Sequence, residues 1–347
     1  MNNMRALIGM SGGVDSSVAA LLMKQAGYEC IGATMRLYDN PTEVSTCCSL
    51  EDVEDARAVA AKLGIRHYAF NFTEDFDRQV MRKFADSYER GLTPNPCIDC
   101  NRYLKFDRLL RRALELGCDW VVSGHYARIR QEKGRYLLYK AVDSAKDQTY
   151  FLACLNQRQL SHIQFPLGEL TKTQVREIAA ENGFVNARKR DSQDICFVPG
   201  GDYGEFLQWY TGKAYPQGDF LDLQGNVVGR HRGAACYTKG QRKHLGLAMG
   251  APVYVCGKDM AQNTVTVGPN EALFSPALRA NDWCWYPFET LEKPLKVTVK
   301  TRHSQFEQPG TVYPEENGFA RVEFDDPQRA VTPGQAVVVY QGDLVVG

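Results

Sequence analysis

The sequence predicts an α/β domain built on a parallel sheet, followed by a small, mostly β central domain and a C-terminal antiparallel β-barrel. Two observations support this fold class. The first part of the 347-residue chain alternates apolar runs with helical stretches, an order that places helices on both faces of a parallel sheet. Near residue 205 the pattern changes to short runs separated by Gly and Asn turns, which is typical of hairpins. We therefore expect domains at 1–204, 205–272 and 273–347.

Four apolar runs in the first part are expected to form parallel strands, at Arg5–Met10, Cys30–Leu37, His67–Phe72 and Trp120–His125. Helices are expected between them, from the SGGVDSS segment to Gly27, over Glu51–Leu63 and over Asn101–Leu116. The helical assignment is based on apolar residues that recur three and four positions apart. Ligands of a parallel sheet bind beyond the carboxyl ends of its strands, so we expect the site in the loops there.

The later part of the chain contains turn residues between short apolar runs. The expected hairpins are 221–229 (LDLQGNVVG) and 255–268 (VCGKDMAQNTVTVG). The expected strands of the barrel are 295–302, 310–324 and 335–340.

Composition and charge exclude some classes of protein. The chain is 44% hydrophobic without an apolar run long enough to cross a bilayer, and its N-terminus lacks the apolar core of a signal peptide. We therefore expect a cytoplasmic location and no membrane partner. Eleven cysteines in so long a chain favour buried thiols, metal ligands or catalytic groups over structural disulfides. The 41 basic and 41 acidic residues cancel, but basic residues gather in 188–190, 226–250 and 296–303, which together favour a phosphate-rich partner.

The segment GMSGGVDSS, Gly9–Ser17, lies between the first expected strand and helix, where backbone N–H groups and the helix dipole bind anions. It is neither a Walker A loop nor a GxGxxG fingerprint, but its paired glycines and serine hydroxyls can surround a phosphate. Asp15 would repel that phosphate unless a cation lies between them, which indicates Mg²⁺. The simpler interpretation is a glycine turn with Ser16 capping the helix.

Two loop-like segments carry cysteines that need an explanation. TPNPCIDCN holds Cys97 and Cys100, and KRDSQDICFV holds Cys196 after a basic cluster. Such cysteines can be half of a zinc site, a redox pair, cluster ligands or carriers of reactive sulfur. A buried structural cysteine is the simpler interpretation of Cys196, because ICFV alone is typical of a strand.

These segments together resemble one family. SGGVDS resembles the signature of the PP-loop ATP pyrophosphatases, which split ATP between its α and β phosphates and adenylate a substrate oxygen. SGGVDSS, TPNPCIDCN and SQDICF, in this order, resemble the tRNA-specific 2-thiouridylases. Further matching segments are GHYARI (124–129), KDQTYFL (146–152), YTKGQRKHLGL (237–247) and VTPGQAVVVY (331–340). The resemblance covers nearly the whole chain.

The resemblance implies ATP-dependent 2-thiolation of the wobble uridine of tRNA. ATP with Mg²⁺ would adenylate the C2 carbonyl oxygen, and a persulfide on Cys196 would supply the sulfur. Cys100 would then resolve the adduct, leaving a transient Cys100–Cys196 disulfide, AMP and pyrophosphate. The implied partners are tRNA and a persulfide donor, either a cysteine desulfurase or a sulfur-relay protein. The implied state is a monomer.

The resemblance also implies binding positions. The ATP-binding positions are Gly9, Met10, Ser11, Gly12, Gly13, Val14, Asp15, Ser16, Met35 and Gly124. The positions at the target base are Asn95, Pro96 and Cys97. The tRNA contacts are His125, Lys146, Asp147, Gln148, Arg302, His303 and Gln335. Simpler roles stay open for two of them, with Asp147 as a helix cap and Gln335 as a turn residue.

Cys97 departs from the family pattern, in which many members have Asp at this position. The departure creates a C-x-x-C, so Cys97, Cys100 and Cys196 could hold three corners of an iron–sulfur cluster whose open iron carries the sulfur. A zinc site from Cys47, Cys48, Cys97 and Cys100 is a further alternative. Two other functions stay open: a PP-loop amidotransferase or ligase, and a zinc-stabilised RNA-binding module.

Overall fold

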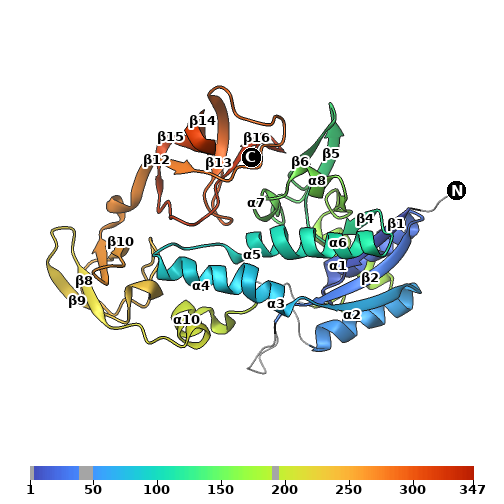
Figure 1. Cartoon of the computed structure of the whole chain (residues 1–347), viewed down its shortest axis with the longest axis horizontal. Coiled ribbons are helices and arrows are strands. Elements are labelled where there is room, and N and C mark those ends of the chain that lie inside the picture. Colours follow the sequence, from blue (N-terminus) through green and yellow to red (C-terminus); the bar gives the residue numbers. More distant parts are fainter. Residues whose placement is uncertain (1–3, 39–49, 190–194) are drawn as a thin grey trace.

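The computed structural model describes residues 4–38, 50–189 and 195–347. The molecule is elongated, with the N-terminal α/β domain at one end, the strands of residues 218–268 at the other and the C-terminal strands between them (Figure 1). Within the described ranges, no helix combines the length and the apolar character that crossing a membrane requires.

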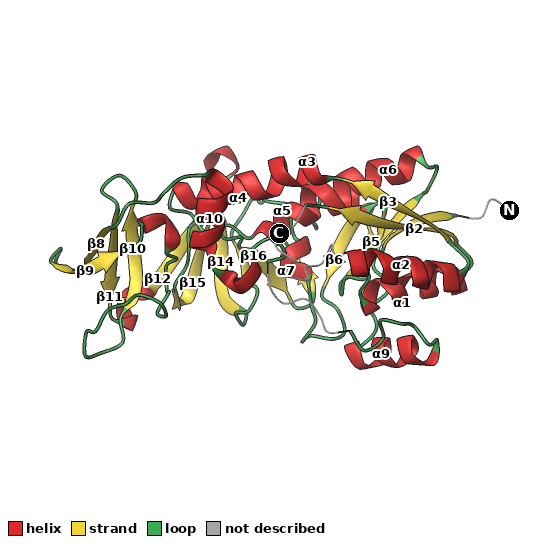
Figure 2. Ribbon diagram, turned by 90° about the horizontal axis from the view of Figure 1, so that it is seen from below, coloured by secondary structure: helices red, strands yellow, loops and turns green. Residues whose placement is uncertain are grey.

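The first domain contains a sheet of five strands, which are β1 Arg5–Gly9, β2 Glu29–Arg36, β3 Arg66–Asn71, β4 Trp120–Val122 and β7 Ile163–Gln164. Their order is β3-β2-β1-β4-β7, and every neighbouring pair is parallel. The α-helices among the described residues are α1 Val14–Gln25, α2 Leu50–Leu63, α3 Thr73–Phe76, α4 Arg82–Glu89, α5 Pro96–Asp99, α6 Leu109–Glu115, α7 Thr149–Leu152, α8 Gln157–Leu160, α9 Lys172–Glu181 and α10 Tyr203–Thr211. Helices α1, α2 and α9 lie on one side of the sheet and α6 on the other (Figure 2), so the predicted fold class is confirmed.

Two expected boundaries in this domain are wrong. The helix expected to begin at Asn101 begins at Pro96 and continues through a π-helical stretch, η2 Cys100–Arg108, into α6. Asn95 and Pro96 are the preferred cap and first residue of a helix, and they outweigh the apolar periodicity that starts later. The strand expected to reach residue 125 ends at Val122, because the chain then turns against the loop between β1 and α1.

Residues 218–268 form a four-stranded sheet from two hairpins. β8 Gly218–Leu221 pairs antiparallel with β9 Val227–His231, and β10 Tyr254–Asp259 pairs antiparallel with β11 Thr264–Gly268. β8 and β11 then run parallel and join the two hairpins. Both predicted hairpins are confirmed.

The C-terminal sheet has eight strands in the order β12-β15-β14-β13-β16-β17-β6-β5. Six strands come from the C-terminal part: β12 Phe274–Ala280, β13 Leu295–Lys300, β14 Gln308–Pro314, β15 Ala320–Arg329, β16 Val338–Gln341 and β17 Leu344–Val345. The other two, β5 Arg128–Glu132 and β6 Arg135–Tyr139, are a hairpin of the first domain that joins through Leu344 opposite Tyr139. The barrel strands therefore continue into the first domain, which the sequence did not predict.

Candidate active site

The phosphate loop lies between β1 and α1, at the carboxyl end of the central strand of the parallel sheet. Gly12 has a φ of 75°, and a Cβ on it would lie 2.3 Å from the carbonyl oxygen of Asp52, so only glycine fits. Ser16 lies inside α1, where its hydroxyl donates to Gly13 O at 3.0 Å and accepts from the N–H of Ser11 at 3.2 Å. The N-cap is Gly13, so the interpretation of Ser16 as the cap is wrong.

Gly124 closes the other side of this loop. It follows β4, and a Cβ on it would lie 2.6 Å from the carbonyl carbon of Asp15, so the two backbones are in direct contact. From the β2 side, Thr34 Oγ1 donates to the carbonyl of Met10 at 2.7 Å. Met35 is half-buried beside Thr34 near the end of β2. The expected ATP-binding positions thus gather around one loop.

Asp15 is neutralised by a side chain that the sequence pattern did not identify. Its carboxylate oxygens accept from Lys172 Nζ at 2.7 and 2.8 Å, and one also accepts from the hydroxyl of Tyr126 at 2.8 Å. An ammonium group therefore lies beside Asp15 in this structure. Lys172 begins α9, whose start is marked by a capping box of Thr171 and Gln174. That box predicts a helix start but not the loop that Lys172 reaches.

Asn186 also holds the phosphate loop and was not predicted. It is buried, and its Nδ2 donates to Gly12 O at 2.8 Å. Three residues later, Lys189 pairs with Asp52 of α2 at 2.8 Å. Residues 186–189 therefore contact the phosphate loop through Asn186 and helix α2 through Lys189.

The loop that the resemblance places at the target base, 93–97 (called the target-base loop), opens the helical run α5–η2–α6. Asn95 is the N-cap of α5, and its Oδ1 accepts from the N–H of Cys97 at 3.1 Å. Pro96 follows as the first helical residue, where its missing N–H costs nothing. Cys97 is exposed, whereas Cys100, one turn later, is 8% exposed and belongs to the core. The two thiols of the C-x-x-C therefore lie in different surroundings.

Cys196 is positioned by its neighbours. The adjacent Phe197 is buried, with its ring 5.3 Å from that of Phe84, and the hydroxyl of Tyr38 donates to the carbonyl of Cys196. Cys196 is half-buried and packs against the apolar cluster that contains Cys100. The two cysteine-bearing segments, which are distant in sequence, therefore contact the same apolar cluster, which extends from Leu7 of β1 to Val345 of β17.

The residues expected at tRNA on the first domain are largely engaged with the protein itself. The carboxylate of Asp147 accepts from Thr149 Oγ1 at 2.6 Å, and burial raises its pKa. The N-cap of α7 is Gln148, so the interpretation of Asp147 as the cap is wrong. Gln148 exchanges two hydrogen bonds with the backbone of Tyr126, at 2.9 and 3.0 Å. Lys146 is half-buried next to them.

His125 lies between two aromatic rings. Its centroid is 5.6 Å from that of Phe106 and 5.9 Å from that of Phe165, and its Nδ1 is 2.7 Å from Ser123 Oγ. Burial lowers the pKa of His125 well below its usual value, so the imidazole is neutral at physiological pH. A neutral ring can stack or donate a hydrogen bond but cannot pair with phosphate as a cation.

The barrel supplies the other expected tRNA residues. Arg302 donates to Thr332 Oγ1 at 2.5 Å, and the ring centroid of His303 lies 4.3 Å from that of Phe151 in the first domain. The amide of Gln335 donates to the backbone of the target-base loop at 2.7 Å. These residues and the segment 146–148 therefore meet along the border between the first domain and the barrel.

In the part of the chain that the structure describes, the ligands of an iron–sulfur cluster or a zinc site are not grouped together. No group of three or more His, Cys, Asp or Glu side chains there converges as metal ligands would, and this includes Cys97, Cys100 and Cys196. Cys47 and Cys48, two ligands of the proposed zinc site, lie outside the described residues.

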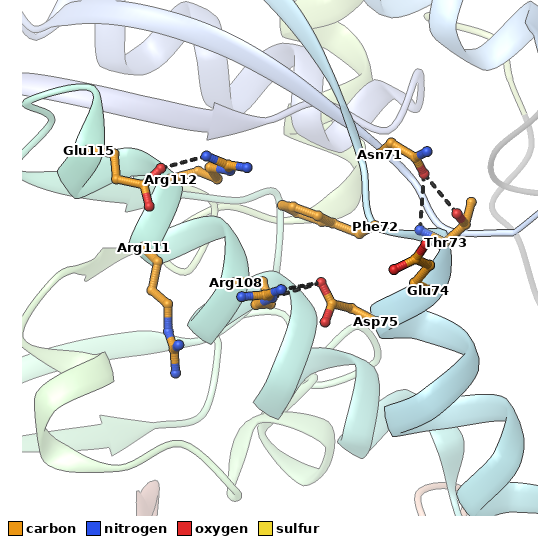
Figure 3. Close-up of a pocket in the computed structure, with 9 residues that line it drawn as sticks. All are labelled: Asn71, Phe72, Thr73, Glu74, Asp75, Arg108, Arg111, Arg112 and Glu115. Carbon is orange, nitrogen blue, oxygen red and sulfur yellow. Dashed lines mark hydrogen bonds and ion pairs between the residues drawn. The ribbon is translucent and has the colours of Figure 1, made fainter.

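A hollow of about 390 Å³ at the end of β3 is a different feature (Figure 3). Three arginines of η2 and α6 line it, but so do acidic partners: Arg108 donates to Asp75 at 2.7 Å and Arg112 to Glu115 at 2.7 Å. Its charges are therefore balanced from within, and it does not include any expected ATP or cysteine position.

Three family models match the chain: tRNA methyl transferase HUP domain over residues 4–200, tRNA methyl transferase PRC-barrel domain over 204–269, and Aminomethyltransferase beta-barrel domain over 275–347. The chain is 49% identical to the tRNA-specific 2-thiouridylase MnmA of Acetivibrio thermocellus, with 100% of this chain and 99% of that one covered. It is 47% identical to the protein of the same name from Clostridioides difficile, with 99% and 97% covered. Among solved structures, it is similar to a 4-thiouridine synthetase in complex with RNA and ATP, at 20% identity and a TM-score of 0.40, with 60% and 50% covered.

Proposed function

Because the chain belongs to the tRNA-specific 2-thiouridylase family and is a tRNA sulfurtransferase, we propose that it replaces the C2 oxygen of the wobble uridine with sulfur in a reaction that consumes ATP. One observation carries this proposal. Asn186 binds the phosphate loop through Gly12 O, and Cys196 packs against the apolar cluster that contains Cys100. A group that activates an oxygen and a group that delivers sulfur are thus linked within one domain.

The first proposed step is adenylation. The C2 carbonyl oxygen attacks the α-phosphorus of ATP, a C–O–P linkage forms, and pyrophosphate leaves with the electrons of the broken P–O bond. We assign the binding of ATP to Gly9–Ser16, Met35 and Gly124, because the loop between β1 and α1 leads into the N-terminus of a helix, where backbone N–H groups can receive phosphates. Mg²⁺ that arrives with ATP would neutralise the departing pyrophosphate, and Asp15 is the carboxylate that the loop offers to it.

The second proposed step is sulfur transfer. The terminal sulfur of a persulfide on Cys196 attacks C2, and the original oxygen leaves as part of AMP. The Cys100 thiolate then attacks the Cys196 sulfur of the adduct, which forms a Cys100–Cys196 disulfide and leaves the second sulfur on the uridine. A thiol reductant restores the two cysteines, and a persulfide donor such as a cysteine desulfurase or a sulfur-relay protein reloads Cys196.

The recognition of tRNA is part of the same proposal. We assign Asn95–Cys97 to the uridine, and the contacts with the rest of the tRNA to His125, Lys146, Asp147, Gln148, Arg302 and His303. This assignment is supported by their position along the border of the first domain and the barrel. Gln335, for which the resemblance implies the same role, donates its amide to the backbone of Thr93 instead. We also propose that the chain acts as a monomer and that 1–204, 205–272 and 273–347 are its functional units.

The competing route uses an iron–sulfur cluster on Cys97, Cys100 and Cys196, and a further alternative is a PP-loop ligase with an amine as nucleophile. We favour the persulfide route because Cys100 and Cys196 supply everything that thiol–disulfide exchange needs without a metal. The ligase alternative would leave both cysteine segments without a function.

The test compares Cys97→Ser, Cys100→Ser and Cys196→Ser without oxygen, with thiouridine and AMP both measured on tRNA. We expect Cys97→Ser to keep measurable thiolation, because neither exchange partner is lost. Cys100→Ser and Cys196→Ser should lose thiolation but keep AMP formation, since the phosphate loop is intact in both. Full thiolation by Cys196→Ser would contradict the persulfide route. Parallel loss of iron and activity in Cys97→Ser would establish the cluster route instead.

A further inference from the structure

Thr93, the residue that begins the target-base loop, is buried where three parts of the molecule meet. Its N–H donates to the carbonyl of Pro333 at 2.9 Å, and its carbonyl accepts from Gln335 Nε2 at 2.7 Å, so the barrel binds both backbone groups. Its hydroxyl is 3.4 Å from that of Thr238, which precedes β10 in the central domain. The chain that enters α5 thus passes beneath the barrel strands (Figure 1).

The contact between the loop and the barrel is a contact between backbones. Gly334, with a φ of 93°, lies so close that a Cβ on it would be 2.8 Å from Thr93 N and 2.9 Å from Leu92 Cβ. A side chain cannot be inserted there without moving the target-base loop. The position of Thr93 is therefore determined by the turn of residues 332–335.

That turn is itself fixed from two sides. The hydroxyl of Tyr150 donates to the carbonyl of Ala336 at 3.0 Å and lies 3.4 Å from Gln335 Oε1. Arg302 donates to Thr332 Oγ1 at 2.5 Å and to the carbonyl of Ala330 at 3.1 Å. Both ends of the Gln335 amide thus contact the protein, one at the target-base loop and one at the segment that contains α7.

We propose that Gln335 is a positioning residue for sulfur transfer, which acts through Thr93 on Cys97 and Cys100. Cys97 lies four positions after Thr93, and Asn95 and Pro96 make the end of that span rigid by starting α5. A shift at Thr93 is therefore carried into the cysteine-bearing turn. The inference rests on the proposed thiolation and differs from the tRNA contact that the family resemblance implies for Gln335.

The test uses Gln335→Met, which keeps the length of the side chain but removes the amide. The matched control is Gln341→Met, because Gln341 donates to Lys296 O within the same barrel, at 3.0 Å, and so holds no part of the target-base loop. We expect Gln335→Met to lower the kcat of thiolation about tenfold or more, since small misplacements of reacting groups have large effects on rate. The Kd for tRNA should stay within about twofold of the wild-type value, because no contact with RNA is removed.

A second readout does not depend on activity. The rate at which iodoacetamide alkylates Cys97 and Cys100, measured without tRNA or ATP, should change in Gln335→Met and stay unchanged in Gln341→Met. Gly334→Ala should reproduce the effect of Gln335→Met, although it removes no side chain that could touch RNA. Thermal unfolding of each variant separates loss of position from loss of fold.

The outcomes are distinct. Weaker tRNA binding by Gln335→Met with unchanged kcat and unchanged alkylation would overturn the inference and establish a direct tRNA contact. Unchanged alkylation in both Gln335→Met and Gly334→Ala would also overturn it. A wild-type protein that does not thiolate tRNA would refute the proposed function, while the alkylation rates would still decide whether Gln335 positions the cysteines.

Discussion

The phosphate loop and the target-base loop are held in place by different parts of the chain. The phosphate loop is bounded by its own domain, by β2 through Thr34, by the turn at Gly124 and by Asn186. The target-base loop depends on Gln335, which is 242 positions away and belongs to the barrel. We therefore expect that activation of the uridine oxygen depends on one domain, whereas delivery of sulfur depends on the assembly of the whole molecule.

The largest effect is expected at the phosphate loop, from Gly124→Ala. The added Cβ would meet the carbonyl carbon of Asp15 at 2.6 Å and must displace the backbone of the loop. AMP formation should fall about 100-fold or more, as for a misplaced catalytic group, while tRNA binding is kept. Gly257→Ala is the matched control, since a Cβ there meets nothing within 4 Å. Near-normal AMP formation by Gly124→Ala would contradict the assignment of this loop to ATP.

A smaller loss of AMP formation is expected from a substitution beside Asp15, again at the phosphate loop. Lys172→Met removes the ammonium that lies 2.7 Å from Asp15 and leaves a part-buried carboxylate without this partner. We expect AMP formation to fall about tenfold, with a loss of unfolding free energy on the order of 1 kcal/mol, because Asp15 keeps some contact with water. Lys62→Met removes an exposed ammonium that donates to Gly183 O, and it should change neither quantity. Equal AMP formation in the two variants would show that Lys172 has no part in handling ATP.

The smallest effect, a change in tRNA binding, is expected from substitutions in the central domain. Arg242 and Lys243 are exposed in a stretch without acidic residues, 226–250. Replacing both by Ala should weaken tRNA binding a few-fold and lower the slope of log Kd against log salt by about 1 to 2, as two lost phosphate contacts would. Arg111→Ala with Arg112→Ala is the control, because these arginines pair with Asp107 and Glu115. An unchanged slope in the Arg242→Ala, Lys243→Ala variant would show that these two residues do not contact phosphates.

Local signals were enough to predict most of the fold. The sheet strands, the turn after β1 and both central hairpins follow from apolar runs and turn residues that lie close together in sequence. β7 was not predictable, because two residues, Ile163–Gln164, are too short to show a period. The pairing of Leu344 with Tyr139 could not be predicted from the sequence either, because only tertiary packing brings these two strands together.

The same division holds for the candidate site. The segments around Asp15, Cys100 and Cys196 could be named from the sequence, because loops between regular elements carry distinctive residues. Their partners could not. Lys172 is 157 positions from Asp15, and Asn186 is 174 positions from Gly12, so no local pattern connects them. At Ser16 a local pattern gave a wrong prediction: its residue type suits a helix cap, but the helix begins earlier and Gly13 is the cap.

The most direct test follows the C2 oxygen of the uridine. This oxygen is activated at the phosphate loop and is then displaced by sulfur from the cysteines, so its fate reports on both steps. A tRNA whose wobble uridine carries a heavy oxygen isotope at C2 would be thiolated by the wild-type protein with unlabelled ATP. If the C2 oxygen is adenylated and then displaced, the isotope should appear in AMP, with one labelled AMP for each thiouridine formed, and pyrophosphate should stay unlabelled. Thiouridine formed alongside unlabelled AMP would contradict adenylation of the C2 oxygen, and with it the division of labour between the phosphate loop and the cysteines.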